Sequence, residues 1–411
     1  MTPAILDATN AAPVQHDVVI VGGGLVGASL AIALDATGVD VALVEASTAD
    51  ALPAVFDERN LSFADATVNA LTALGVLQKL RTPGAAIRRI HVSRAGDFGR
   101  VKLDAADYGR DAFGQVVVAR DFGDALEARL RELTRLTRYR PARFIGVEIG
   151  DAANRIDIVD ANGQRTLMAK LLVGADGTRS QVRGALHIDA DEHAYGQALF
   201  VARVAVDRAP DGTAFERFGA HGPIALLPRG DRHFGVVFGV AEDDADRVAA
   251  MDDAGFLVHL QQAFGWRAGR FRSVGPRSRY PALSLRARAT VAMRSVLVGN
   301  AAQTLHPVGA QGFNLGLRDA LTLAELIREC PGDPGEPGLL AAHARRRAED
   351  RDRTFAFSDG LARATANPAA LMRPLRSMGL IALDALPSLQ SALAGGAMGY
   401  RGDVPALCRP R

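Results

Sequence analysis

Three glycines and one acidic residue near the start of the chain have the spacing of a phosphate-binding turn. A buried apolar run at residues 18–21 leads into Gly22-x-Gly24-x-x-Gly27, and Glu45 follows Gly22 by 23 residues. A carboxylate about 20 residues after such a motif is placed to accept hydrogen bonds from a ribose. Strand, glycine turn, helix and acid in this order predict a dinucleotide-binding βαβ unit.

Each glycine of the motif has its own physical reason. Gly22 permits the tight turn out of the strand, Gly24 lets the backbone approach a pyrophosphate, and Gly27 lets the helix pack close to the sheet. The phosphate charge would lie at the helix N-terminus, where unpaired N–H groups and the positive end of the helix dipole point at it. From this unit we expect six cofactor contacts: Gly22, Gly24, Leu25, Val26, Gly27 and Glu45.

The same stretch resembles a membrane segment, because residues 18–34 carry no charge and their number is close to the ~20 residues needed to span a bilayer. However, no Lys or Arg precedes Arg59, whereas a signal peptide begins with a basic region. Asp17 and Asp35 flank the run where a membrane helix prefers Lys, Arg or aromatic residues. We therefore expect neither a spanning helix nor a signal peptide here.

Composition narrows the class of protein. With 411 residues, 48% of them hydrophobic, the chain can bury a large core in two or three domain-like units. Two cysteines, Cys330 and Cys408, are too few for a disulfide framework, which favours a reducing compartment such as the cytoplasm. A net charge of +2 gives no basis for nucleic-acid binding, although it would tolerate an anionic membrane surface. We expect no metal site.

Hydrophobic periodicity predicts the elements that position the glycine turn. A loop from residue 57 feeds an amphipathic helix that ends near residue 75, and a charged helix covers residues 121–138. Residues 144–172 alternate like strands around an Asn162-Gly163 hairpin turn, and residues 171–175 read as a buried strand. The first part of the chain is therefore expected to continue the sheet of the βαβ unit.

The middle of the chain changes character. Residues 198–240 have strand patterning without a nucleotide motif, which makes them the candidate substrate-facing sheet. A short buried strand at residues 296–299 then precedes a glycine-rich loop and a helix from Leu315. The fold class expected is α/β, a Rossmann-type nucleotide-binding domain with an inserted mixed β-sheet substrate domain and a C-terminal helical segment. Its expected boundaries are 1–185 (with a substrate-side excursion near 86–115) and 291–340 for the nucleotide domain, 186–290 for the substrate domain and 341–411 for the helical segment.

The C-terminal part reads as helical. Residues 343–353 form a charge run, for which a solvated helix face is the expected structure. Residues 371–397 are apolar at helical spacing but contain Pro374, Asp384 and Pro387, which exclude a single spanning helix. We expect this segment to pack on the core, with contact to a lipid surface or a partner as the alternative.

Two later segments carry further glycine-containing motifs, one of which includes an acid. At Asp176-Gly177 and at residues 298–314 the chain resembles the flavoprotein aromatic hydroxylases of the para-hydroxybenzoate hydroxylase type, and the resemblance covers nearly all of it. The resemblance implies further contacts to FAD at Arg59, Gln115, Arg120, Asp176, Asn300, Pro307, Gly309, Gln311, Gly312 and Asn314. Taken alone, Asp176-Gly177 could be a plain turn and His306 a satisfied loop histidine.

Within that family, the sequences of residues 297–320, 215–228 and 380–400 resemble the ubiquinone-biosynthesis hydroxylases of the 2-polyprenyl-6-methoxyphenol hydroxylase group. Most relatives have Asp where this chain has Asn300, and that Asp holds a sugar hydroxyl of FAD. An amide can still accept this hydrogen bond through its carbonyl, as an uncharged acceptor. The resembling branch often has Asn here, so we interpret Asn300 as a subgroup feature.

The resemblance implies a reaction. NADPH or NADH, bound transiently, reduces FAD; O2 then adds to give a flavin C4a-hydroperoxide, whose terminal oxygen passes to a carbon of a polyprenylated phenol, converting 2-polyprenyl-6-methoxyphenol to 2-polyprenyl-6-methoxy-1,4-benzoquinol. Such a site must exclude water, place N–H groups near the flavin N1/O2 edge, which residues 309–314 suit, and offer an acceptor to the phenol. The catalytic residue is unknown from sequence, with His221 and Tyr280 as candidates only. Other ubiquinone-biosynthesis proteins are possible partners, and a cytoplasmic enzyme at the face of the inner membrane is expected.

Alternatives remain open. A plain NAD-dependent dehydrogenase would leave Asp176-Gly177 and residues 299–314 unexplained, and a flavin-dependent halogenase would need a Trp-x-Trp signature where the chain has only Trp266. An FAD monooxygenase acting on another ring position or another aromatic substrate fits the same motifs. A non-catalytic relative that uses the groove to bind a lipid or a partner has Asn300 as its only support.

Overall fold

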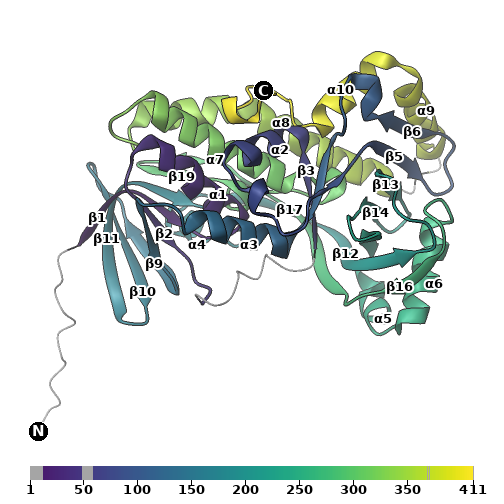
Figure 1. Cartoon of the computed structure of the whole chain (residues 1–411), viewed down its shortest axis with the longest axis horizontal. Helices are drawn as coiled ribbons and strands as arrows, with labels where there is room; N and C mark the ends of the chain where they lie inside the picture. The colour runs from purple at the N-terminus through teal and green to yellow at the C-terminus, as the bar shows by residue number, and fades with distance from the viewer. Residues whose placement is uncertain (1–12, 49–58, 368, 370, 411) are drawn as a thin grey trace, which may run out of the picture.

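The computed structural model describes residues 13–48, 59–367, 369 and 371–410. Within these residues the chain forms two large sheets and one small sheet, with helices packed between and around them (Figure 1). The start of the loop expected from residue 57 lies outside the described residues. The arrangement is the predicted α/β fold.

The first large sheet carries the glycine motif. Its strand order is β18 (Val291–Ala292), β19 (Ser295–Leu297), β11 (Gly163–Gly174), β1 (Val14–Val21), β2 (Val41–Val44) and β8 (Leu136–Tyr139), with β10 (Asn154–Asp160) pairing with β11 and β9 (Ala142–Glu148) pairing with β10. β1 is parallel to both β2 and β11, and α1 (Leu25–Leu34) connects β1 to β2. The predicted βαβ unit is therefore present.

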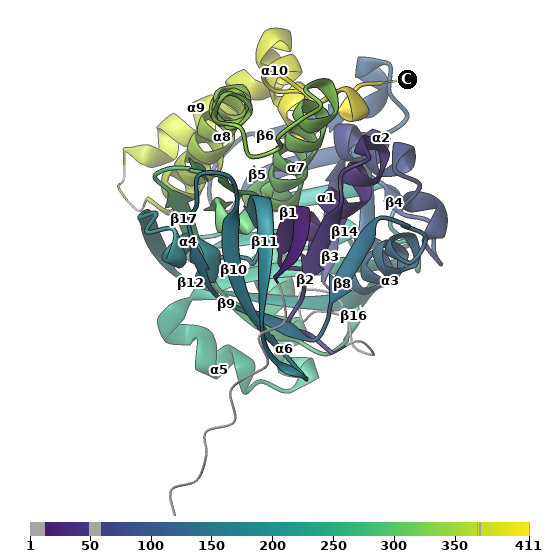
Figure 2. The ribbon, with the colours of Figure 1, turned by 90° about the vertical axis from the view of Figure 1, so that its left-hand side faces the viewer.

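Both faces of this sheet are buried, which explains the unbroken apolar runs of its strands. Val18 and Ile20 pack on one face against α1, α3 (Ala119–Leu130), α7 (Gly312–Glu329) and α8 (Pro337–Ala366). Val19 and Val21 pack on the other face with β9, β10 and α4 (Gln181–Ala185). Figure 2 shows the helices and the β9–β10 hairpin on either side of the sheet.

The second large sheet has the order β20 (Gln303–Thr304), β17 (Ser278–Ala287), β12 (Ala190–Val206), β15 (His233–Ala241), β14 (Pro223–Pro228), β13 (Thr213–Phe218), β5 (Arg89–Arg94) and β6 (Arg100–Asp104), with β16 (Phe271–Val274) on β12. Phe256 and Leu260 of α6 (Asp253–Phe264), with Val248 of α5 (Ala245–Ala249), pack on one of its faces. A small sheet of β3 (Asn60–Ala64), β7 (Gly114–Val118) and β4 (Ala85–Ala86), followed by α2 (Asp65–Ala73), lies between the two large sheets.

The C-terminal segment forms α9 (Met372–Ala385) and α10 (Pro387–Ala397), and α9 packs on β6 at one end of the molecule (Figure 1). Across the described ranges, no individual helix has both the length and the apolar character needed to cross a membrane. α9 and α10 meet that test only when joined, and they are bent by 89° at the break between them.

Three sequence expectations are wrong in detail. The helix expected at residues 121–138 ends at Leu130, and β8 joins the edge of the first sheet because its residues pair with β2. The loop expected before α2 contains strand β3, which pairs with β7. The charge run in α8 is not wholly solvated, because His343, Arg347 and Asp350, on one stripe of the helix, are at most 1% exposed. The domain boundaries proposed from sequence stay a prediction.

Candidate functional site

The glycine turn between β1 and α1 has the geometry expected of it. Gly22 has φ +106°, and a Cβ there would lie 2.5 Å from the carbonyl oxygen of Ala175. A Cβ on Gly27 would lie 1.9 Å from the oxygen of Gly22, so only glycine lets α1 pack this close. Gly24 has φ −72°, which any residue adopts, so its backbone conformation does not require glycine. Gly24 is the N-cap of α1 and lines the cavity there, so a side chain at this position would enter the cavity in front of the N-terminus of α1.

Glu45 follows β2 and lies beside this turn. Its Oε2 accepts a hydrogen bond from the N–H of Gly23 at 2.7 Å, and its Oε1 accepts one from the N–H of Ser47 at 2.7 Å. These two bonds fix the carboxylate at the carboxyl end of the parallel strands, where ligands bind in open α/β sheets.

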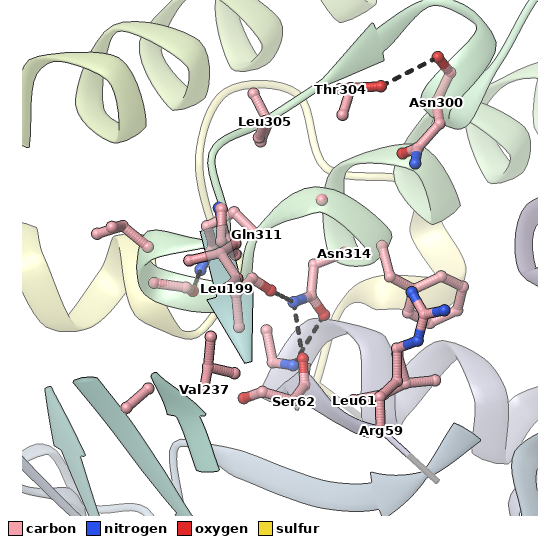
Figure 3. Close-up of a pocket in the computed structure, with 18 of the residues that line it drawn as sticks. Arg59, Leu61, Ser62, Leu199, Val237, Asn300, Thr304, Leu305, Gln311 and Asn314 are labelled. Carbon is pink, nitrogen blue, oxygen red and sulfur yellow. Dashed lines mark hydrogen bonds between the residues drawn. The ribbon is translucent and has the colours of Figure 1, made fainter. Parts of the chain in front are cut away.

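Asn300 is brought to the same place by close packing of glycines. A Cβ on Gly299 would lie 2.9 Å from Val26 of α1, and a Cβ on Gly316 of α7 would lie 2.7 Å from the Cα of Gly299. The backbone oxygen of Asn300 accepts a bond from the Thr304 hydroxyl at 3.4 Å, as Figure 3 shows. The Asn300 side chain is exposed and has no hydrogen-bond partner among the described residues. Its amide is therefore available to a ligand.

The loop before α7 has a constrained backbone. Gly309 and Ala310 have φ +72° and φ +50°, and α7 begins at Gly312, where a Cβ would meet nothing within 4 Å. The first N–H groups of α7 lack helical partners and carry the positive end of the helix dipole. This loop therefore presents N–H donors to the space in front of it.

Asn314 holds this loop in place. Its Oδ1 accepts from the N–H of Ala64 at 2.9 Å, and its Nδ2 donates to the carbonyls of Ser62 and Ala310, each at 2.9 Å (Figure 3). The residue is 1% exposed. In the described structure, the side chain of Asn314 thus joins the loop to β3.

Asp176 lies at the end of β11, and its side chain caps α4. It accepts bonds from the Ser180 hydroxyl at 2.5 Å and from the N–H groups of Gln181 and Val182 at 2.7 and 3.1 Å. Gly177 next to it has φ +85°, as a turn requires. The carboxylate therefore already has a structural role, and a contact to a cofactor there stays a prediction.

Arg59 and Tyr280 form a pair opposite the loop. The guanidinium carbon of Arg59 lies 4.6 Å from the centre of the Tyr280 ring, and Nη2 of Arg59 donates to the Tyr280 hydroxyl at 3.3 Å. Tyr280 lies on β17 of the second large sheet, and Arg59 immediately precedes β3 of the small sheet. The pair therefore connects these two sheets.

These groups line one cavity of about 1440 Å³. This volume exceeds the ~300–1,000 Å³ of common small-molecule pockets, so the cavity has room for a large cofactor and a second ligand. Of the predicted cofactor residues, those that line it are Gly22, Gly24, Leu25, Val26, Glu45, Arg59, Asp176, Asn300, Pro307, Gly309, Gln311, Gly312 and Asn314.

Three predicted cofactor residues are not in the described lining of this cavity. Gly27 lies behind the turn, as its packing role requires. Gln115 is half-buried on β7, and Arg120 is exposed at the start of α3. The assignment of Gln115 and Arg120 to the cofactor stays a prediction.

The cavity continues from the glycine turn to the second large sheet. Leu199 and Val237 of this sheet line the same cavity as Gln311, which precedes α7, and Asn314 in the first turn of α7; Figure 3 shows Leu199 next to Gln311. Beyond them the wall is formed by apolar side chains of β5, β6, α9 and α10: Ile90, Val92, Val101, Leu103, Leu380, Leu383, Leu393 and Ala397. One end of the cavity is thus polar and rich in backbone donors, and the other is apolar.

The two catalytic candidates from sequence fall in different places. Tyr280 lines the cavity, whereas His221 is exposed in the turn between β13 and β14 and is not part of the described lining. Sequence reasoning missed Glu216, a carboxyl in the middle of the apolar wall. The sequence offers one signal for Glu216, which is an acidic residue within a segment that has the patterning of a strand and forms β13.

His306 is the satisfied loop histidine considered from sequence. Its Nε2 meets Oε1 of Gln197 at 3.3 Å, its Nδ1 accepts from the N–H of Val308 at 3.3 Å, and burial lowers its pKa to about 4. Among the described residues, no group of three His, Cys, Asp or Glu side chains is placed to hold a metal ion.

A buried ion cluster supports α7 behind the loop. Arg318 and Asp319 of α7 pair with Asp350 and Arg347 of α8, at N···O distances of 2.6 and 2.8 Å. Burial raises the pKa of Asp350, but the neighbouring Arg318 and Arg347 outweigh it and hold this pKa below its usual value. Burial lowers the pKa of His343 in the same region to about 4. The residues of α8 that the sequence predicted to be solvated, Arg347 and Asp350, are therefore buried and bind α7 through ion pairs.

Comparison of the sequence with known proteins supports an FAD-binding role for this site. Residues 15–356 match the family model described as an FAD binding domain. The chain is 34% identical over 398 residues to the ubiquinone hydroxylase UbiL of Rhodospirillum rubrum, covering 95% of this chain and 91% of that one. It is 28% identical over 316 residues to 3-demethoxyubiquinol 3-hydroxylase of Escherichia coli, covering 76% and 79% of the two chains.

Solved structures show the same fold. The p-nitrophenol 4-monooxygenase PnpA of Pseudomonas putida superposes with a TM-score of 0.80 at 19% identity, covering 95% of this chain and 99% of that one. Together with the site, the family match and the similarity to UbiL define an FAD-dependent aromatic monooxygenase that uses NAD(P)H and O2. The chain belongs to the FAD-binding-domain family that includes the ubiquinone hydroxylase UbiL.

Proposed function

We propose that the enzyme acts in ubiquinone biosynthesis and hydroxylates 2-polyprenyl-6-methoxyphenol to 2-polyprenyl-6-methoxy-1,4-benzoquinol. The observation that carries this proposal is the single cavity that joins the glycine turn to an apolar wall on β5, β6, α9 and α10. A polyprenyl chain needs an apolar path to the reacting end of the site. Two relatives, UbiL of Rhodospirillum rubrum and UbiM of Neisseria meningitidis, are named ubiquinone hydroxylases, which supports the same substrate class.

The residues of the polar end fit FAD, as the space kept open at Gly24 indicates. The N-terminus of α1 at Leu25 and Val26 would hold the pyrophosphate, and Glu45 and Asn300 would accept bonds from sugar hydroxyls. When bound, FAD takes a hydride from NADPH or NADH and activates O2 for transfer to the phenol ring. Apart from the N–H of Ala310, which donates to the carbonyl of Pro307, the N–H groups of residues 309–314 would stabilise negative charge that develops in front of α7. The apolar wall keeps water from the reacting atoms.

A contact with the membrane face is part of the proposal. The inner side of α9 and α10 lines the cavity, while the outer side exposes Leu371, Leu375, Met378, Ile381, Leu386 and Leu389. Phe98, in the turn between β5 and β6, is 77% exposed, and its N–H donates to the Ser377 hydroxyl of α9. Apolar surface of this kind is typical of binding sites for lipid or protein. We propose that it rests on the cytoplasmic side of the inner membrane, where a prenylated substrate resides.

A deletion strain tests the function. Without this gene the cell should accumulate a prenylphenol intermediate and lose ubiquinone, and the wild-type gene should restore ubiquinone. Complementation with Gly24→Val, which should not hold FAD, serves as the matched negative control. Unchanged ubiquinone in a genome without a redundant hydroxylase would assign the enzyme to another aromatic substrate.

A further inference from the structure

Among the described residues, the apolar wall of the cavity contains one acidic side chain, that of Glu216. Glu216 on β13 is paired across the sheet with Val92 of β5 and Ala225 of β14. The same row continues to Val101 on one side and to Val237 and Val201 on the other. All six residues line the cavity. A carboxyl in the centre of an otherwise apolar row has no packing reason to be there, because burying it costs free energy.

This carboxyl differs from the two other acids in the described lining of the cavity, Glu45 and Asp176. Glu45 and Asp176 are held by backbone or hydroxyl donors, as described above. Glu216 has no hydrogen-bond or ion-pair partner among the described residues. The carboxyl of Glu216 can therefore form a hydrogen bond with a ligand that carries a hydroxyl.

Charged groups near this wall are engaged elsewhere. Arg94 of β5 and Arg376 of α9 both pair with the buried Asp97, at 3.2 and 2.8 Å. Arg401 lies over the ring of Phe357, and Arg59 lies over Tyr280. His91 and Arg217 neighbour Glu216 in the sheet but are not in the described lining, and the lining residues of β6, β14, β15 and α10 carry no charge. Burial is the cause that raises the pKa of Glu216 to about 8.

The position of Glu216 suits the reacting ring. Val237, which lines the same cavity as the loop that precedes α7, is two strands away in the same row. At ~4.8 Å between strands, the two Cα atoms are separated by roughly 10 Å. An aromatic ring held between the loop and the sheet is thus within reach of the Glu216 side chain, and a tail attached to it can extend along β5 and β6.

We propose that Glu216 is the catalytic residue that takes the proton of the phenol hydroxyl. The proposal rests on the phenolic substrate of the proposed function. The O–H bond of the phenol breaks, the proton goes to a carboxylate oxygen of Glu216, and the electron pair stays on the phenolate oxygen. Electron density at the ortho and para carbons rises, so the ring is more readily attacked by the electrophilic oxygen that the enzyme delivers. The hydroxylated product regains the proton when it leaves.

The test measures product formation by the FAD-loaded enzyme between pH 6 and pH 10, with a short-chain 2-prenyl-6-methoxyphenol. In the wild type, kcat/KM should rise through an apparent pKa of about 8, in line with the pKa of Glu216. Glu216→Gln should lose on the order of 10²–10⁴-fold at pH 8, as expected for removal of a general base. Its remaining rate should rise only toward the phenol's own pKa, about 10.

Two comparisons separate proton transfer from a structural effect. A fluorinated analogue that is ionised at neutral pH should restore hydroxylation by Glu216→Gln, because its proton is already gone. Glu148→Gln, the same change at an exposed site on β9, should behave as the wild type. Glu216→Asp should keep the rise near pH 8 at a reduced rate.

The outcomes are distinct. If the wild type hydroxylates the prenylphenol but Glu216→Gln keeps its rate and pH profile, or gains nothing from the ionised analogue, the role of Glu216 is overturned and the proposed function stands. If the wild type hydroxylates no prenylphenol at any pH, both fall together.

Discussion

Arg318 of α7 and Asp350 of α8 form an ion pair at 2.6 Å in which both side chains are at most 1% exposed. The oxygen of Asp350 that Arg318 contacts also accepts a bond from Nη2 of Arg347 at 2.5 Å. Asp350 therefore bridges two guanidinium groups in the interior, and together with Asp319, which pairs with Arg347, it balances their charge where an unpaired charge is costly.

Asp350→Asn should lower the free energy of unfolding by about 3–5 kcal/mol, because it leaves buried guanidinium charge without its partner. Asp352→Asn is the matched control, since Asp352 is exposed and pairs with Arg286 at the surface, where a pair is worth ~0–1 kcal/mol. Denaturant unfolding measures both. Because the pKa of Asp350 lies below its usual value of 3.8, this contribution is present at neutral pH and is lost only as the pH falls below that value. Equal losses in the two variants would contradict this role.

Gly24→Val should yield protein without bound flavin. The φ of −72° accepts a Val without backbone strain, so the side chain should act on the ligand and not on the fold. Flavin absorbance of the purified protein measures occupancy, and Gly146→Val on β9, where a Cβ would meet nothing within 4 Å, is the control. A yellow Gly24→Val protein would show that the pyrophosphate does not approach this turn.

Asn300→Asp should bind FAD more tightly, by about 1 kcal/mol, because a charge-assisted bond to a sugar hydroxyl is stronger than a neutral one. Titration of the apo-protein with FAD gives the affinities of Asn300→Asp, Asn300→Ala and the wild type. Weaker binding by the Asp variant would mean that Asn300 donates this hydrogen bond and does not accept it.

The apo-protein should lose stability as the pH rises, partly through Glu216. Its pKa is raised from 4.5 to about 8, so between these values the folded state retains a proton that the unfolded state has released. The slope of unfolding free energy against pH is then negative, and the penalty is complete above pH 8. The denaturant midpoint of Glu216→Gln, compared with that of the wild type at the same pH, should therefore increase steadily from pH 5 to pH 8. A difference that does not change with pH would contradict the raised pKa.

Replacing Leu375 and Met378 by Glu should weaken binding to anionic liposomes by roughly tenfold or more, because two apolar side chains leave the contact and like charge enters it. Their side chains are 52% and 66% exposed on α9. Trp266→Glu is the control, since Trp266 is equally exposed but does not lie on α9 or α10. Flotation of the FAD-loaded protein measures the effect, and equal losses in both variants would point to charge alone.

The parts of the site that depend on backbone geometry could be predicted from the sequence. Gly22 and Gly309 occupy left-handed conformations, and glycine spacing reports such positions directly. Glu216 could not be found this way, because its meaning depends on neighbours in β5 and β14 that are distant in the chain. The same holds for Arg347, whose partner Asp319 lies on another helix.

Errors in the predicted elements have a similar origin. Charged residues follow Leu130 at helical spacing, yet residues 136–139 become strand β8 because the edge of β2 offers them hydrogen bonds. Strand β3 was not predicted because it is only five residues long and is stabilised by antiparallel pairing with β7, which is distant in the chain. Local patterns therefore predicted the βαβ unit well and failed where a segment is defined by its partner.

The side chain of Asn314 bonds to three backbone groups, two at β3 and one in the loop before α7. The loop and the strand consequently form one mechanical unit. A ligand that displaces Ala310 would pull through Asn314 on β3, which directly follows Arg59, the partner of Tyr280. Filling the polar end of the cavity is thereby communicated to the sheet on which the substrate ring would lie.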